Sequence, residues 1–73
     1  MQACILIRTL PGKTTTVLGA VKKFPEIKSA FMVFGRYDVV AFAEAPNYEA
    51  ICALTARVNA VSETKNTESL IEG

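Results

Sequence analysis

Two apolar runs, Phe31–Phe34 and Val39–Ala43, flank a short polar insert that begins at Gly35. Aromatic and β-branched residues dominate both runs, which favours pleated strands over a helix. Gly35 can adopt positive φ and Asp38 can accept hydrogen bonds from nearby backbone amides, so the insert suits a tight or bulged turn. The stretch therefore predicts a β-hairpin. Two interpretations of its turn stay open: a purely structural reversal of the chain, or a loop that presents Tyr37 and Asp38 to a ligand.

The segments around this hairpin carry the signals of a mixed α and β chain. Pro11-Gly12 ends a first strand and precedes a helical pattern, which one of the threonines at 14–16 is expected to cap and which Pro25 stops. Asn47 is a good N-cap for a second helix, and a polar loop at 62–66 precedes a short last strand. The predicted elements are strand Ala3–Leu10, helix 13–24, strands Ile27–Phe34 and Tyr37–Ala45, helix 47–59 and strand Thr67–Ile71.

This order predicts an α+β fold, the ferredoxin-like βαββαβ sandwich, in which a four-stranded antiparallel sheet carries both helices on one face. The predicted strands are apolar on both faces, however. In the first strand Ala3, Ile5 and Ile7 point one way, and Cys4 and Leu6 point the other way. An exposed apolar face of this extent would exceed the usual patch on a monomer. We therefore expect the domain to dimerise through the uncovered face of its sheet.

Size, charge and cysteine content exclude several classes of protein. The 73 residues leave room for one domain, and a net charge of +1 without a block of like charges argues against direct nucleic-acid binding. No apolar run approaches the length of a membrane span, and the start lacks the basic leader of a signal peptide. Cys4 and Cys52 stand in apolar stretches and are expected to be buried and reduced, so we expect a cytoplasmic protein.

The sequence offers little of the chemistry that catalysis needs. It has no histidine, the commonest general base, and two separated cysteines cannot form a usual zinc site. The Gly-Lys-Thr run at 12–14 lacks the upstream glycine of a P-loop. Glu44 and Glu68 are expected to be solvated, whereas Asp38 begins an apolar strand beside a glycine turn. A lone carboxylate suits an anchor for an amino group better than a catalyst, so we expect no enzyme and no cofactor.

The run Phe34–Val40, together with Thr67–Ile71 and the opening Leu6–Gly12, resembles the effector-binding domain of the Lrp/AsnC transcription regulators, also called the RAM domain. The resemblance spans nearly the whole chain, and the glycine-x-tyrosine-aspartate hairpin is its most specific part. A second family, GYD, carries a comparable hairpin followed by a segment like Glu44-Ala45-Pro46. The Pro-Gly turn after the first strand and the short first helix favour the regulator domain.

The resemblance implies an assembly and a ligand site. Members of the family pair through their sheets, their dimers commonly gather into rings of four, giving an octamer, and small effectors, usually amino acids, bind in clefts between dimers. The hairpin then supplies backbone groups and an acid, and the loop before the last strand contributes from the neighbouring dimer. A glycine is usual where Glu63 stands, so that loop is expected to differ in shape. The ligand-binding residues implied in this chain are Gly35, Tyr37, Asp38, Thr64, Lys65 and Thr67.

The first predicted strand begins at Ala3, whereas full-length regulators carry a helix-turn-helix domain before the sheet. Residues 1–73 are therefore interpreted as a stand-alone effector-binding domain without a DNA-reading part, which would sense amino acids or modulate a full-length relative by mixed assembly. Two alternatives stay open because one fold hosts many functions. One is an assembly partner without a ligand, and the other is a small enzyme similar to the cofactor-free monooxygenases of the dimeric α+β-barrel plan.

Overall fold

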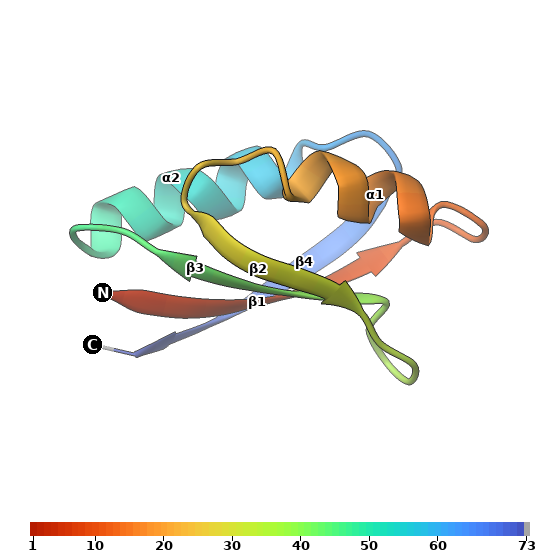
Figure 1. Ribbon diagram of the computed structural model, residues 1–73, viewed down its shortest axis with the longest axis horizontal. Helices are drawn as coiled ribbons and strands as arrows, with labels where there is room; N and C mark the ends of the chain where they lie inside the picture. Colours follow the sequence, from red (N-terminus) through yellow and green to blue (C-terminus); the bar gives the residue numbers. More distant parts are fainter. Residues whose placement is uncertain (73) are drawn as a thin grey trace.

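Strands and helices follow one another in the computed structural model in the predicted order, and the structure describes residues 1–72 (Figure 1). The predicted domain, residues 1–73, extends one residue past this range. The elements are β1 (Gln2–Thr9), α1 (Thr14–Val21), β2 (Ile27–Met32), β3 (Val39–Glu44), α2 (Tyr48–Asn59) and β4 (Thr64–Glu72). Neither of these helices is long and apolar enough to cross a membrane.

The four strands form one antiparallel sheet in the order β2-β3-β1-β4, and both helices lie on one face of it (Figure 1). β1 is central: Ile5 stands opposite Ala41 of β3 on one side and opposite Ser69 of β4 on the other. The predicted ferredoxin-like fold is therefore confirmed. Because side chains alternate along a strand, this register also decides which residues face the helices and which face away.

The core lies between the sheet and the two helices. Its sheet side is made by the apolar odd-numbered residues of β1 and β3, at 3–7 and 39–43, and its helix side by the apolar stripes of α1 and α2. The side chains that are completely buried are Ile5, Ile7, Val17, Val21, Val39, Ala41, Ile51, Leu54 and Val58. The face that the sequence assigns to Ala3, Ile5 and Ile7 is thus the face that the helices cover.

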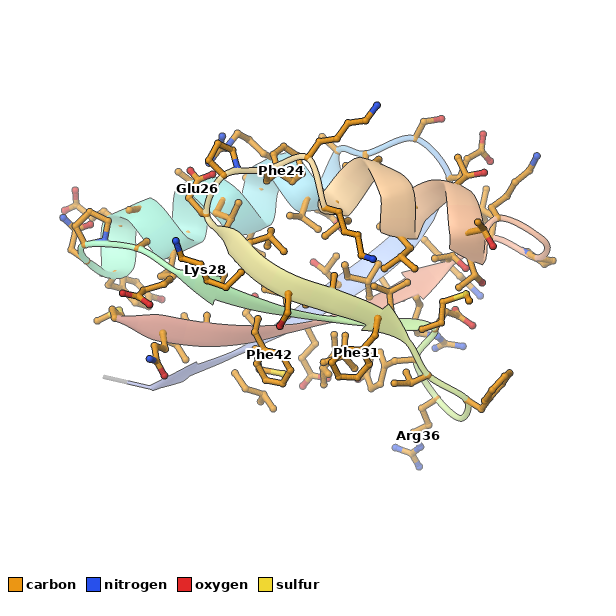
Figure 2. The ribbon with its side chains drawn as sticks, in the orientation of Figure 1. Phe24, Glu26, Lys28, Phe31, Arg36 and Phe42 are labelled. Atoms are coloured by element: carbon orange, nitrogen blue, oxygen red, sulfur yellow. The ribbon has the colours of Figure 1, made fainter. Side chains whose placement is uncertain are left out.

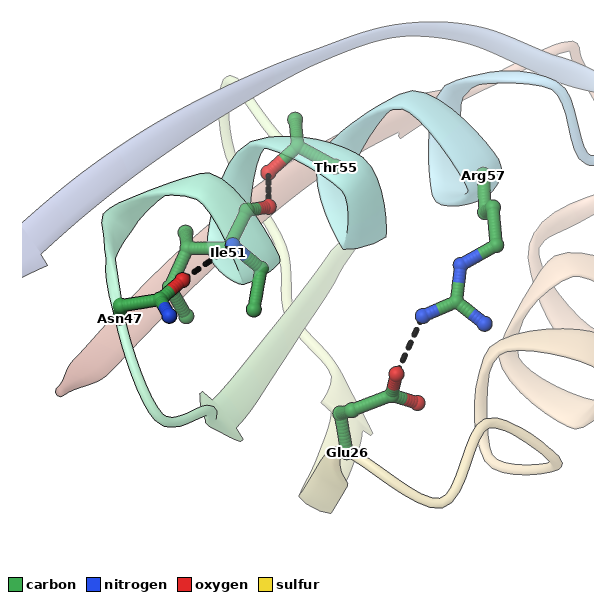
Figure 3. Close-up of polar contacts among 6 residues, drawn as sticks. Glu26, Asn47, Ile51, Thr55 and Arg57 are labelled. Carbon is green, nitrogen blue, oxygen red and sulfur yellow. Dashed lines mark hydrogen bonds and ion pairs between the residues drawn. The ribbon is translucent and has the colours of Figure 1, made fainter.

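The second helix begins as predicted. The side-chain oxygen of Asn47 accepts a hydrogen bond from the backbone N–H of Ala50 at 2.9 Å, which is the N-cap geometry. Near the other end of α2, Arg57 forms an ion pair with Glu26, in the turn before β2 (Figure 3). Its guanidinium carbon also lies 5.4 Å from the ring centre of Phe24. These contacts tie α2 to the connection between α1 and β2.

The first helix departs from its prediction at both ends. Lys13 occupies the N-cap position, and among the described residues its side chain makes no capping bond. The predicted threonine cap is wrong, because Thr14 is already helical and its hydroxyl lies 3.0 Å from that of Thr9. The helix also ends at Val21, and Phe24 packs against the core from the turn that follows.

Two predicted boundaries shift near the candidate site. The turn of the hairpin spans residues 33–38, because pairing between β2 and β3 ends at Met32 and Val39. The last strand begins at Thr64 and not at Thr67, so the predicted loop at 62–66 is largely strand. The reason is that Thr64 pairs with Thr9 beyond a register shift, at which β4 carries one residue more than β1, and this lets the polar start of β4 join the edge of the sheet.

Candidate functional site

Asp38, at the end of the hairpin loop, is fixed by three hydrogen bonds. Its carboxylate oxygen Oδ2 accepts from the backbone N–H of Thr9 at 2.9 Å. Its own N–H donates to the carbonyl of Ile7 at 2.9 Å, and its carbonyl accepts from the N–H of Val33 at 2.9 Å. A carboxylate that accepts from a backbone amide forms a strong, charge-assisted bond. The loop is therefore bound directly to the end of the central strand.

Tyr37 makes a second connection, to the edge strand. Its hydroxyl donates a hydrogen bond to the carboxylate of Glu68 in β4. This bond, then desolvation and the charge of Glu68, raise the pKa of Tyr37, while the charges of Arg36 and Arg8 act in the opposite direction. Glu68 was expected to be merely solvated; it is exposed, but it holds the tyrosine in place. Tyr37 and Asp38 thus lock the loop across β1 to β4.

Gly35 and Glu63 are the turn residues of the two loops that the resemblance assigns to the site. Gly35 has φ +131° and is exposed, so the predicted positive φ is present. Glu63 has φ +75°, a left-handed conformation that glycine adopts without strain. The turn before β4 therefore uses a glycine-type backbone although it carries a glutamate. At Gly35 a side chain would find open space but a strained backbone.

The three residues expected from the loop before the last strand all lie within β4. Thr64 stands opposite Thr9, the residue that holds Asp38, and among residues 1–72 its buried hydroxyl oxygen has no hydrogen-bond partner. Lys65 is exposed, and Thr67 stands opposite Ile7 on the helix-covered side. Within one copy of the chain, Thr64 and Asp38 therefore both lie next to Thr9. The six predicted ligand-binding residues do not all come together in that copy.

Sequence reasoning missed the part that Thr9 plays. This threonine is buried, its amide binds Asp38, and its hydroxyl lies 3.0 Å from that of Thr14 at the start of α1. It joins the hairpin loop, the central strand and the first helix at one end of the sheet. The available signal was weak: a polar residue at the end of an apolar strand, directly before Leu10 and a Pro-Gly turn.

The face of the sheet away from the helices is apolar and open. Phe31 and Phe42 stand side by side on it with ring centres 5.9 Å apart, and their exposed fractions are 46% and 43% (Figure 2). Leu70 is 56% exposed, and Cys4, Leu6 and Val40 are half-buried on the same face. We call these six residues the open face. A depression of about 610 Å³ lies toward the end of the sheet that holds Gln2 and Glu44.

The cysteines are free, but their predicted burial is wrong in part. Cys4 is half-buried on the open face, where desolvation raises the pKa of its thiol. Cys52 is exposed on α2, because it lies outside the stripe of Ile51, Leu54 and Val58 that faces the core. Among the described residues, no group of three histidine, cysteine or acidic side chains could hold a metal ion.

Comparisons with known proteins agree with this fold. The chain superposes on TTHA0845 of Thermus thermophilus with a TM-score of 0.93 and 22% identity, covering 99% of this chain and 91% of that one. It superposes on PHS023 of Pyrococcus horikoshii with a TM-score of 0.89 and 27% identity, covering 99% and 88%. The match to Escherichia coli AsnC has a TM-score of 0.83 and 18% identity and covers 97% of this chain but only 50% of AsnC.

No curated protein sequence matches the chain significantly. The family model described as the Lrp/AsnC ligand binding domain, by contrast, matches residues 2–72, nearly the entire chain. The resemblance read from the hairpin and from the two ends of the sequence is therefore confirmed, and this chain belongs to the Lrp/AsnC ligand-binding domain family.

Proposed function

We propose that this domain binds a small effector of the amino-acid class in a cleft that forms beside its hairpin loop when copies associate. The observation that carries the proposal is the family match over residues 2–72, because the matching family is described as a ligand-binding domain. The chemistry of the loop supports the class of ligand. Asp38 uses Oδ2 to accept from Thr9, and a carboxylate has a second oxygen that can accept from an ammonium group.

Association is part of the proposal because one copy does not gather the predicted ligand residues. Gly35, Tyr37 and Asp38 would come from one copy, and Thr64, Lys65 and Thr67 from another, as the family resemblance implies. The open face supplies the first contact, between two sheets. The two longest dimensions of the molecule are 33 and 20 Å, so a contact along the whole sheet can approach the roughly 800 Å² per partner of a standard interface. Dimers would then assemble into an octamer.

We also propose a binding module and not an enzyme, acting in the cytoplasm without a cofactor. The sequence has no histidine, and the buried polar residue of the site, Thr9, serves to orient the loop. Two free cysteines are typical of a reducing compartment. The module would act on amino-acid metabolism, alone or by mixed assembly with a longer regulator; the chain spans about half the length of such a regulator, Escherichia coli AsnC.

A thermal-shift screen of the common amino acids followed by calorimetry tests the ligand. A ligand that binds only the folded protein raises its melting temperature by mass action. The variant Asp38→Asn retains an oxygen for the Thr9 amide but loses the charge, so we expect binding to weaken by about tenfold or more. Glu49→Gln, on the first turn of α2, is the matched control and should bind as the parent does. Absence of binding by every amino acid, in a protein that still associates, contradicts the proposal.

One observation favours a second function, assembly without a ligand. The carboxylate of Asp38 already has an internal partner, the Thr9 amide, so its role can be wholly structural. In that case Asp38→Asn should change stability or oligomeric mass while no amino acid produces heat in either protein. The same two proteins in the same calorimeter therefore separate the two functions.

A further inference from the structure

The two ends of the open face differ in shape. At the end away from the chain termini, the loop between β2 and β3 projects beyond the sheet on the side opposite the helices (Figure 1). Arg36 of this loop lies on the same side as Phe31 and Phe42 (Figure 2), and Phe34 is completely exposed. We call Phe34 and Arg36 the hairpin tip. Aromatic and arginine side chains are the residue types that anchor protein–protein interfaces, and the hairpin tip exposes one of each.

At the other end the open face is hollow. The depression of about 610 Å³ is lined by Gln2, Ala3, Cys4, Lys28, Phe42, Ala43, Glu44, Leu70 and Ile71. Its apolar side chains suit an aromatic ring, and the carboxylate of Glu44 suits a guanidinium. Lys28 lines the same hollow, so its walls hold one charge of each sign. The chemistry of this depression thus complements the hairpin tip of the same chain.

From this complementarity we infer that two copies meet end over end, so that the hairpin tip of each fills the depression of the other. The inference rests on the proposed association through the open face and adds its register. The two-fold axis of such a pair runs across the strands near Leu6 and Val40, which stand opposite each other. This position lies between the depression at Cys4 and Phe42 and the loop that follows Met32. Two tips then enter two depressions, as a closed, isologous contact requires.

The same axis also aligns the hairpin tip of one copy with the depression of the other in the direction across the strands. It reverses the direction of the strands but keeps their order, so β2 and β3 of one copy lie over β2 and β3 of the other. The tip lies between these two strands, and Lys28 and Glu44 belong to the same two strands. An axis parallel to the strands would instead bring both tips to one end, hold the sheets apart there and leave both depressions empty, at the cost of packing contacts.

Cross-linking between two variants tests this register. Arg36→Cys and Glu44→Cys are made separately in a Cys4→Ala, Cys52→Ala background, and each is confirmed to be folded and associated under reducing conditions. A short bismaleimide should link the two chains when they are mixed, in a dimer that contains one of each, and should link neither variant to itself. Asn59→Cys, on the helix layer, is the control and should link to none of them.

Each outcome decides between named geometries. Links of Arg36→Cys to itself, or of Glu44→Cys to itself, overturn the end-over-end register in favour of the parallel axis. Absence of any link between the two variants in a protein that remains dimeric also overturns it, while leaving the proposed association intact. A parent chain that stays monomeric overturns the association itself, so the two failures are distinguishable.

A charge exchange gives a second readout that needs no cysteine. Arg36→Glu and Glu44→Arg should each weaken association by about tenfold, and the double exchange should restore it to within about threefold of the parent. Lys23→Glu, on the helix layer, is the matched control and should leave the dissociation constant unchanged. Equal losses that add in the double variant would contradict the proposed Arg36–Glu44 contact.

Discussion

The two faces of this sheet are both apolar, but they are built from different side chains. The apolar centre of the face under the helices consists of Ile5, Ile7, Val39 and alanines, which are aliphatic and buried. The open face carries Phe31, Phe42 and larger aliphatic residues that remain half-exposed. Small and branched residues let helices approach a sheet closely, whereas aromatic rings provide the large contact areas of protein interfaces. The composition of a face thus indicates whether the chain covers it alone.

The difference follows from the size of the helices. α1 has eight residues and α2 has twelve, and the core residues that they supply are valines, an isoleucine and a leucine. Such a layer can seal one face of four strands and no more. We conclude that the covered face determines the stability of a single copy, and we propose that the open face determines how copies assemble. The following substitutions separate the two effects.

The largest effect is expected from a charge on the open face. Phe42→Asp should weaken association by about 4 kcal/mol, roughly a thousandfold in Kd, because two copies each lose a buried ring worth about 2 kcal/mol. Sedimentation equilibrium measures the loss, and far-UV circular dichroism should stay that of the parent. An unchanged association constant would show that the open face is not the contact.

The next effect concerns the covered face. In the Phe42→Asp background, Leu54→Ala should lower the free energy of unfolding by about 3 kcal/mol, because a fully buried leucine leaves a cavity. Leu70→Ala is the same substitution on the open face and should cost less than about 1 kcal/mol in that background. Urea denaturation gives both values. Equal losses would remove the distinction between the two faces.

A smaller effect is expected at the start of α2. Asn47→Ala removes the oxygen that accepts from the Ala50 amide and should cost about 1 kcal/mol of folding stability. Because the helix lies on the covered side, the dissociation constant of the assembly should not change. Asn59→Ala, at the last residue of the helix, is the control, and a loss there as large as at Asn47 would contradict the capping role.

The smallest effect is a dependence on pH. The hydrogen bond from Arg57, followed by a backbone hydrogen bond, lowers the pKa of Glu26 in the folded chain. A lowered folded-state pKa means that the ion pair stabilises the fold fully above the unfolded-state pKa and less as the pH falls through the folded-state value. Glu26→Gln should therefore flatten the acid side of a urea-midpoint titration. Lys23→Gln should not, and an unchanged slope in Glu26→Gln would contradict the assignment.

Much of the fold could be predicted because its signals are local. The alternation of Ile5 and Ile7 with Cys4 and Leu6 defined two apolar faces, and Asn47 capped the helix that it was expected to cap. The start of β4 could not be predicted, since Thr64 and its polar neighbours have no strand pattern of their own. They join the sheet because β1 offers Thr9 as a partner. Pairing between distant strands overrides local propensity there.

The candidate site shows the same limit more strongly. The hairpin residues Gly35, Tyr37 and Asp38 could be singled out from their spacing, and Gly35 has the positive φ expected of it. Their partners could not, because Thr9 is 29 residues from Asp38 and Glu68 is 31 residues from Tyr37. Only the antiparallel register of β1 with its neighbours brings these residues together.

The central claim is that a second copy covers the open face, and the mass of the parent chain in solution tests it most directly. Light scattering on a size-exclusion column should give at least twice the mass of one chain, falling toward a single chain only on strong dilution or on introduction of Phe42→Asp. A parent protein that elutes as one well-behaved chain at every concentration would contradict the account.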